Sequence, residues 1–161
     1  MNKKYSSHSK HNHFMDRCIQ LANRAMLEGN PPVGSVLVKN GEIIAEGIEA
    51  GKSSGDVTAH AEIEVIRSAL LKGIQDFCEY TMYSTHEPCV MCSYVIRHYQ
   101  IRELVYGVEV DELGGESSRY PLLTDRNIAK WNYGPNIVKG IKRQNIEKLS
   151  ILYQERKIKN K

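Results

Sequence analysis

Two short segments constrain most strongly what this chain can fold into: His60-Ala61-Glu62 and Pro88-Cys89-Val90-Met91-Cys92. Imidazole nitrogen and thiolate sulfur are the ligands that zinc prefers. Cys89 and Cys92 are three residues apart, so the first turn of a helix would bring both sulfurs to one point. A helix start also lowers the pKa of a thiol, which favours the thiolate. The fold must therefore bring the beginnings of two helices together, with His60 as the third ligand.

Three protein ligands leave one zinc position open for water, which is typical of a catalytic site. Glu62 lies two residues after His60 and can receive and return protons without ligating. A Cys-x-x-Cys pair alone could be a redox pair or part of a structural site completed by Cys78 or His86. His-x-Glu followed by Pro-Cys-x-x-Cys is the established signature of zinc nucleobase deaminases, with the Glu as general acid and base. The ordered pair therefore favours catalytic zinc.

Hydrophobic periodicity and turn residues predict a mixed α/β architecture. The expected elements are helices over 14–28, 59–72, 89–98 and 124–131, a closing helix near 146–153, and strands over 33–38, 42–48, 80–84, 103–106 and 136–141. Asn40-Gly41 favours a hairpin between the first two strands. The later strands alternate with helices and favour parallel pairing. The fold class is therefore a mixed five-stranded sheet between helices, with residues 136–141 as an edge strand.

The ends of the chain differ in character from its middle. Residues 1–13 are polar and predict a disordered leader whose His8, His11 and His13 bind metal weakly at most; residues 14–161 form a single domain. No apolar run approaches the ~18 residues of a membrane span, and no secretory signal opens the chain. We therefore expect a cytoplasmic protein without membrane contacts.

Positive charge is concentrated at the C-terminal end. Residues 139–161 hold eight Lys and Arg against two Glu, a balance of +6, whereas the whole chain carries +3. Such a segment could contact an anion such as RNA, or it could be a solvated helix face. Both interpretations remain open from the sequence.

Three segments, 30–38, 58–63 and 87–92, resemble the cytidine deaminase superfamily, and the bacterial tRNA adenosine deaminases and guanine deaminases most of all. The similarity runs from about Phe14 to Leu123. It implies a three-layer α/β/α cytidine-deaminase-like fold, one zinc ion per subunit with a catalytic water, and a homodimer. It also implies that the backbone amide of Ala61 contacts the substrate, and it places Val33, His86 and Glu87 in segments expected to border the substrate pocket.

One departure from the family pattern concerns the substrate base. After the second strand these relatives read Glu-Gly-x-Asn, with the Asn on the base, whereas this chain reads Glu46-Gly47-Ile48-Glu49. An ionised Glu only accepts hydrogen bonds, so Glu49 in the pocket would prefer a base edge rich in N–H groups, such as that of guanine. Alternatively, Glu49 faces solvent. Asp111, Glu112 or Glu116 could supply a second carboxylate for proton transfer.

Three functions follow as hypotheses. The main one is a deaminase of a free purine base or nucleoside of the guanine or guanosine type. The alternative is a tRNA adenosine deaminase that makes inosine in the anticodon, whose salt-sensitive RNA binding would be lost without residues 142–161. The remote alternative is a non-catalytic, zinc-stabilised interaction module, which would not depend on Glu62.

Overall fold

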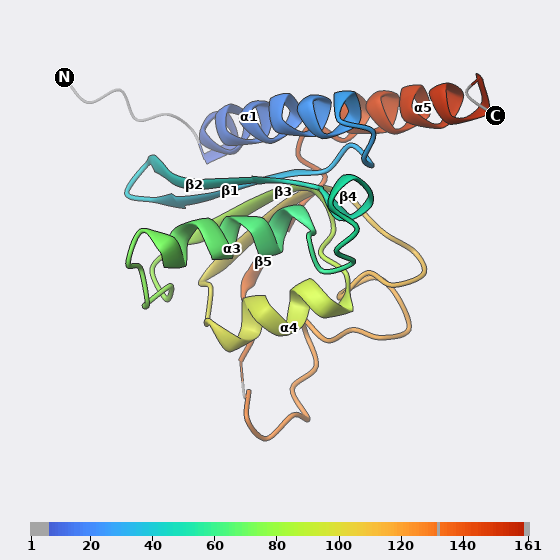
Figure 1. The fold of residues 1–161 in the computed structure, drawn as a ribbon. Helices are drawn as coiled ribbons and strands as arrows, with labels where there is room; N and C mark the ends of the chain where they lie inside the picture. The colour runs from blue at the N-terminus through green and yellow to red at the C-terminus, as the bar shows by residue number, and fades with distance from the viewer. Residues whose placement is uncertain (1–6, 132, 160–161) are drawn as a thin grey trace.

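The computed structural model describes residues 7–131 and 133–159. They build a five-stranded sheet in the order β2-β1-β3-β4-β5, with helices on both faces (Figure 1). The strands are β1 Gly34–Lys39, β2 Glu42–Ile48, β3 Thr81–His86, β4 Glu103–Val108 and β5 Asn136–Lys139. The helices are α1 Ser7–Leu27, α2 Gly51–Ser54, α3 Ala61–Leu71, α4 Val90–His98 and α5 Arg143–Lys159. The predicted three-layer α/β class is confirmed.

Strand pairing follows the expected pattern. β1 pairs antiparallel with β2 and with β3, and β3, β4 and β5 run parallel. Asn40 and Gly41 between the first two strands have φ values of 53° and 83°. Positive φ at both central residues is the requirement of a type I′ turn, which matches the twist of the two strands. The Asn-Gly signal therefore identified this hairpin correctly, and β5 is the edge strand that was predicted.

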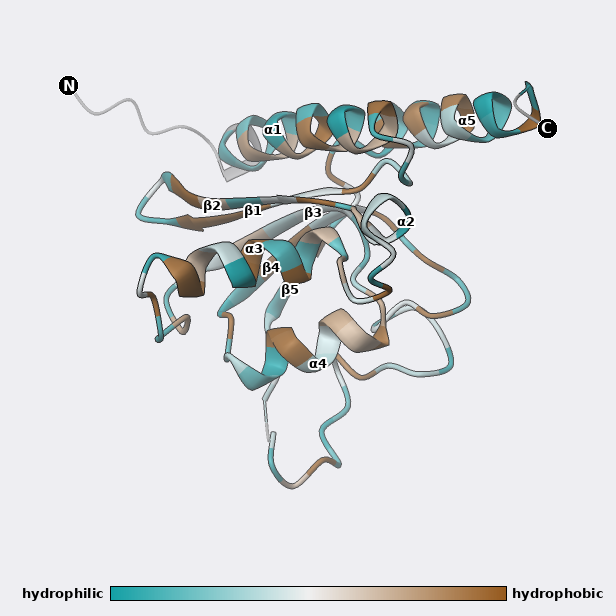
Figure 2. Ribbon diagram, viewed as in Figure 1, coloured by the Kyte–Doolittle hydropathy of each residue, from teal (hydrophilic) through white to brown (hydrophobic). Residues whose placement is uncertain are grey.

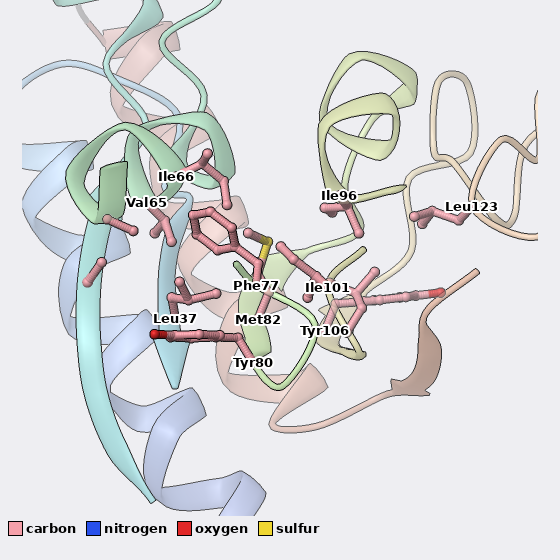
Figure 3. Close-up of a cluster of buried hydrophobic side chains, with 13 residues drawn as sticks. Leu37, Val65, Ile66, Phe77, Tyr80, Met82, Ile96, Ile101, Tyr106 and Leu123 are labelled. Carbon is pink, nitrogen blue, oxygen red and sulfur yellow. The ribbon is translucent and has the colours of Figure 1, made fainter. Parts of the chain in front are cut away.

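The sheet separates two apolar layers. α1 and α5 cover one face, where Met15 and Cys18 of α1 meet Val36, Tyr83 and Ile146. α3 and α4 cover the other face, and Figure 3 shows Val65 and Ile66 of α3 beside Leu37, Phe77 and Met82. Apolar stretches along β1 and β2 are brown in Figure 2, between the two helix layers. Because both faces of the sheet are covered, the central strands β1, β3 and β4 are buried along most of their length with little alternation.

Helix α1 ends as predicted but begins earlier. The Gly29 amide donates to the Met26 carbonyl and the Asn30 amide to the Ala25 carbonyl, with Gly29 at φ 87°. This is a Schellman motif, in which glycine adopts the left-handed conformation that ends the helix. The helix begins at Ser7, so the disordered leader predicted over residues 1–13 is wrong for residues 7–13. His11 contacts the Tyr83 hydroxyl at 3.0 Å, a tertiary contact that periodicity does not register.

Two glycines allow helices to approach the sheet closely. A Cβ on Gly47 of β2 would lie 2.4 Å from the Ala61 carbonyl oxygen of α3, and one on Gly34 of β1 would lie 2.3 Å from the Cys18 carbonyl oxygen of α1. Both distances are shorter than a real Cβ tolerates. Gly47 thus sets the separation between β2 and the first turn of α3.

The segment after β4 differs from the prediction. No helix forms over 124–131; the chain makes irregular turns there. Buried Arg97 of α4 explains the difference, since its guanidinium donates to four carbonyl oxygens of this segment. They belong to Leu122, Asp125, Trp131 and Tyr133, at 2.6–3.2 Å. Carbonyls engaged by Arg97 are directed away from the intrahelical bonds that a helix needs.

Among the described residues, no helix is long and apolar enough to cross a membrane.

Candidate active site

The three predicted zinc ligands converge at the beginnings of two helices. His60 is the N-cap of α3 and Cys89 the N-cap of α4, and neither makes a capping hydrogen bond with its side chain. Thr58, two residues before His60, donates its hydroxyl to Asp56. The His60 imidazole and the Cys89 thiol are therefore not used in capping, and both point to the site. Among the described residues, His60, Cys89 and Cys92 form the one cluster able to hold a metal.

The spacing of the three ligand atoms fits tetrahedral zinc. The Cys89 and Cys92 sulfurs are 3.8 Å apart, and they lie 3.5 and 3.6 Å from His60 Nδ1. Zinc with Zn–S about 2.3 Å and Zn–N about 2.0–2.1 Å at tetrahedral angles requires about 3.8 Å between two sulfurs and about 3.6 Å between sulfur and nitrogen. All three separations agree. The residues present therefore match the metal, with one coordination position left for a water.

The ligands influence one another before any metal binds. Hydrogen bonds from Cys92 and then from His60 lower the pKa of the Cys89 thiol to about 4. The hydrogen bond to Cys89, followed by burial, raises the pKa of Cys92. The hydrogen bond to Cys89 raises the pKa of His60 to about 9. The lowered pKa of Cys89 favours its thiolate, which is the form that a metal ion binds.

Glu62 lies beside the ligands on the first turn of α3. The side chain is buried; its Oε1 accepts a hydrogen bond from the Ser84 hydroxyl at 2.6 Å, and its Oε2 lies 3.5 Å from Cys92 Sγ. Burial raises the pKa of the Glu62 carboxyl, and the Ser84 hydrogen bond opposes part of that rise. A carboxyl with a raised pKa can hold a proton between two transfers. Sequence reasoning missed Ser84, because Thr81, Tyr83, Ser84, Thr85 and His86 of β3 all carry polar groups and nothing local singles out one of them.

Glu49 faces the zinc ligands rather than solvent. Its side chain is buried, and its Oε1 accepts a hydrogen bond from the Gly51 amide at 3.0 Å. Burial raises the pKa of Glu49, while the Gly51 and Ala61 amides and the His60 imidazole act in the opposite direction. The Glu49 amide in turn donates to the Val33 carbonyl at 3.0 Å. Val33, Glu49 and Ala61 are therefore neighbours at the His60 end of the site.

Glu87 and the acidic residues beyond β4 have other partners. The buried Glu87 carboxylate accepts hydrogen bonds from Val110, Glu116 and Ser117, so the expected direct contact with substrate is corrected to a contact with this loop. Glu116 accepts hydrogen bonds from Tyr106 and Lys139, which direct it away from Glu62. Asp111 and Glu112 are exposed. The second carboxylate at the site is thus Glu49, which sequence reasoning considered only as a contact to the base.

His86 does not join the site. Its Nδ1 lies 3.1 Å from the Thr85 hydroxyl and its Nε2 lies 3.1 Å from the Ser150 hydroxyl of α5. α5 covers the face of the sheet opposite to α3 and α4 (Figure 1). The expectation that His86 lies at the pocket mouth is therefore corrected. The end of β3 turns its ring toward α5 instead.

His86 provides a pH-dependent contribution to stability. Burial lowers the pKa of His86 from 6.5 to about 4. Between these values the unfolded chain binds a proton that the folded chain does not, so the free energy of unfolding falls as pH drops from about 7 to 4. At about pH 4.5 this loss amounts to ~2–3 kcal/mol. We expect His86→Gln to remove it, measured as a smaller difference in urea-unfolding free energy between about pH 7.5 and 4.5. Equal pH dependence in both proteins would refute the assignment.

The comparisons with known proteins agree with this geometry. The family model for the cytidine and deoxycytidylate deaminase zinc-binding region matches residues 8–108. A tRNA-specific adenosine deaminase of Streptococcus pyogenes (serotype M18, strain MGAS8232) is 35% identical over 117 residues, covering 72% of this chain and 74% of that protein. The one of Haemophilus influenzae (strain ATCC 51907 / DSM 11121 / KW20 / Rd) is 35% identical over 152 residues, covering 92% and 86%.

Solved structures extend the similarity to three dimensions. A structure from a study of A-to-I editing by tRNA:A34 deaminases matches with a TM-score of 0.78 at 31% identity, covering 85% of this chain and 98% of that one. Guanine deaminase from Bacillus subtilis matches with a TM-score of 0.58 at 37% identity, covering 62% and 64%. The family model includes His60, Cys89 and Cys92, whose spacing fits zinc, and Glu62 beside them. This chain therefore belongs to the cytidine deaminase superfamily and is a zinc-dependent enzyme that hydrolytically deaminates a nucleobase or nucleoside.

Proposed function

We propose that this protein is a tRNA adenosine deaminase that converts adenosine to inosine in an anticodon. The observation that carries the proposal is the similarity to relatives of that name over 92% of the chain, together with the tRNA:A34 deaminase structure, of which 98% is covered. The guanine deaminase structure is matched over a smaller share of both chains. The comparisons thus favour the RNA substrate over the free purine that Glu49 suggested.

The chemistry of the site suits this reaction. His60, Cys89 and Cys92 would hold zinc, which supplies the positive charge that makes water a nucleophile at neutral pH. Glu62 is within reach to take a proton from the attacking water and deliver it to the purine ring. A second transfer protonates the amino group, and the C–N bond breaks to release ammonia. The Ser84 hydroxyl at 2.6 Å keeps the Glu62 carboxyl in place through these transfers.

A basic surface beside the site supports an RNA substrate. We define it as Lys52 of α2 with Arg156, Lys157 and Lys159 of the last turn of α5. Lys52 Nζ lies 2.7 Å from the Tyr153 hydroxyl and 5.3 Å from the centre of its ring, so α2 is held against α5. α2 begins two residues after Glu49. The basic end of α5 follows Tyr153 at the same end of the sheet as α2 (Figure 1), and we propose that phosphates of a bound RNA loop lie there.

Neutralising this end of α5 tests the RNA contact. Deleting residues 142–161 would be ambiguous, because Ile146 and Leu149 are buried in the core. We instead expect Arg156→Gln, Lys157→Gln and Lys159→Gln together to weaken anticodon stem-loop binding ~10-fold at about 150 mM salt. Each lost phosphate contact should reduce the salt slope of log affinity by about 0.7–0.9. Filter binding across a salt series measures both quantities.

A matched variant removes three positive charges from the opposite end of the sheet. Lys39, Lys72 and Arg102 lie at the end of β1, just after α3 and before β4. Changing these three to Gln should leave the salt slope close to that of the wild type. If both triple variants bind RNA equally, the α5 surface is a solvated helix face, as the sequence also allowed.

The decisive assay is inosine formation in a tRNA anticodon stem-loop by zinc-loaded protein, alongside ammonia release from free bases and nucleosides. Turnover of the RNA with none of the small compounds supports the proposal. Turnover of guanine or guanosine alone would overturn it in favour of the second candidate. That candidate keeps one specific observation: Glu49 is buried beside Ala61 and His60, where an acceptor-only side chain would favour a base edge rich in N–H groups.

We further propose that the active form is a homodimer, as the family resemblance implies. Tyr94, Leu113 and Tyr120 are each about half exposed on and near α4, at 48%, 51% and 52%. Large apolar side chains exposed together are typical of an interface. Light scattering on the purified protein would give the mass of one chain if the proposal is wrong.

A further inference from the structure

Glu87 is a buried carboxylate whose hydrogen-bond partners all belong to one loop. It is 3% exposed, and no Lys or Arg pairs with it among the described residues. Its donors are the amides of Val110, Glu116 and Ser117 at 2.9, 2.7 and 2.8 Å, and the Ser117 hydroxyl at 2.5 Å. Burying a charge is costly unless such bonds compensate it. All four donors come from the eight residues 110–117, so the Glu87 carboxylate holds this stretch in place.

The held stretch, residues 109–118, runs directly against the zinc ligands. The Val90 amide donates to the Leu113 carbonyl, and the Gly115 amide donates to the Pro88 carbonyl. Gly114 forms an isolated antiparallel bridge with Cys89. Glu87 itself lies two residues before Cys89. One carboxylate thus connects the 109–118 loop to the strand-to-helix turn that carries both thiols.

Two glycines are needed for this close packing. A Cβ on Gly114 would lie 2.5 Å from the Glu87 carboxylate, and one on Gly115 would lie 1.9 Å from the Ser93 hydroxyl of α4. A side chain on Gly115 would press against α4, and one on Gly114 would press against Glu87 and the Val110 carbonyl oxygen, 2.4 Å away. Gly114, Gly115 and Glu87 therefore act together as one close contact between loop and helix.

Leu113 of this loop and the residues that follow the loop line a depression of about 600 Å³. Val90, next to Cys89, contributes to its lining together with Leu113, Arg119 and Tyr120. Val90 directly follows the zinc ligand Cys89 in the chain, so the depression borders the turn that carries this ligand. It is placed to receive the part of a substrate that lies beyond the reacting base.

We propose that Glu87 is a positioning residue for deamination, fixing the 109–118 loop as the wall that binds the substrate beyond its reacting base. Glu87 touches neither the metal ligands' donor atoms nor the proton path of Glu62 and Ser84. Loss of its hydrogen bonds would therefore weaken substrate binding without removing the chemistry. The expected kinetic effect rests on the proposed function, whereas the expected effect on the loop does not.

Glu87→Gln is the informative substitution because it keeps the volume and removes one acceptor oxygen. The amide NH₂ would then face donors that now bind a carboxylate oxygen. We expect hydrogen exchange at the amides of 110, 116 and 117 to quicken at least ~10-fold, and zinc to remain at one ion per chain. KM should rise ~10-fold or more, while kcat changes less than ~3-fold. Glu42→Gln, on an exposed site in the β1–β2 hairpin, makes the same charge change and should alter none of these quantities.

Ser117→Ala and Gly114→Ala keep the test decisive if Glu87→Gln does not fold. Ser117→Ala removes one donor of four and should give a smaller effect of the same kind, and Gly114→Ala should displace the loop with Glu87 unchanged. Unchanged exchange in the variants would overturn the proposal. So would an equal fall in kcat at constant KM. If no substrate is turned over at all, the proposed function fails, and the exchange and zinc measurements still decide the role of Glu87.

Discussion

Glu62→Gln should lower kcat by ~10³-fold or more while zinc content and fold remain those of the wild type. The carboxyl is buried, accepts a hydrogen bond from Ser84 at 2.6 Å and lies 3.5 Å from the Cys92 sulfur. A glutamine keeps the bond from Ser84 but cannot take up and return a proton. General acid–base catalysis contributes about 10²–10⁴-fold, and the proposed function assigns both proton transfers of the reaction to this one group.

The same substitution should not reduce stability. Burial raises the pKa of Glu62, which means that the folded state disfavours its charge. A neutral amide relieves this cost, so we expect a melting temperature equal to or above that of the wild type. Glu64→Gln is the matched control, since Glu64 lies two residues after Glu62 on α3 and pairs with Arg67 at the surface. Full activity in Glu62→Gln would refute the assignment of the proton transfers to this carboxyl.

Cys92→Ala should abolish zinc binding and, with it, activity. Cys92 is fully buried and completes a triangle of ligand atoms with sides of 3.5, 3.6 and 3.8 Å. Without Cys92, His60 and Cys89 alone would bind zinc so weakly that dialysis would remove the ion. Zinc measured by atomic emission should fall from about one per chain to near zero. Because zinc present at about 1,000 times its dissociation constant stabilises the folded state by ~4 kcal/mol, melting should fall by ~10 °C.

The matched control for this experiment is Cys78→Ala. Cys78 is exposed, and the metal cluster among the described residues does not include it. Its variant should retain zinc, activity and melting temperature, whereas a chelator applied to the wild type should reproduce the Cys92→Ala result. Retention of a full zinc equivalent by Cys92→Ala would place the metal elsewhere and contradict the site.

Much of the fold follows from local patterns. The apolar spacing of α1, its glycine stop and the Asn40-Gly41 turn each depend on residues close together in the chain, and each was predicted within a few residues. The metal ligands were also readable, because the helix starts that present them are local features. Their exact spacing needed the sheet, which brings β3 and the turn before α3 together.

What local patterns could not reveal depends on residues far apart in the chain. Ser84 reaches Glu62 across 22 positions, and Glu87 reaches Ser117 across 30. Arg97 donates to backbone carbonyls up to 36 residues away in the sequence. Because of these hydrogen bonds, residues 124–131 form irregular turns in place of the expected helix. His86 turns to Ser150, 64 positions on, rather than to the pocket.

The sequence by itself determined the three zinc ligands, the α/β frame that holds them and the proposal of Glu62 as the acid–base carboxylate. The tertiary structure alone decided which other polar groups serve that chemistry. The physical reason is burial, since a charged side chain excluded from water must find hydrogen-bond partners wherever the fold supplies them. Glu49 was buried toward the ligands and Glu87 toward a loop. The residues next to Glu49 and Glu87 in the sequence do not indicate which of these two environments each carboxylate occupies.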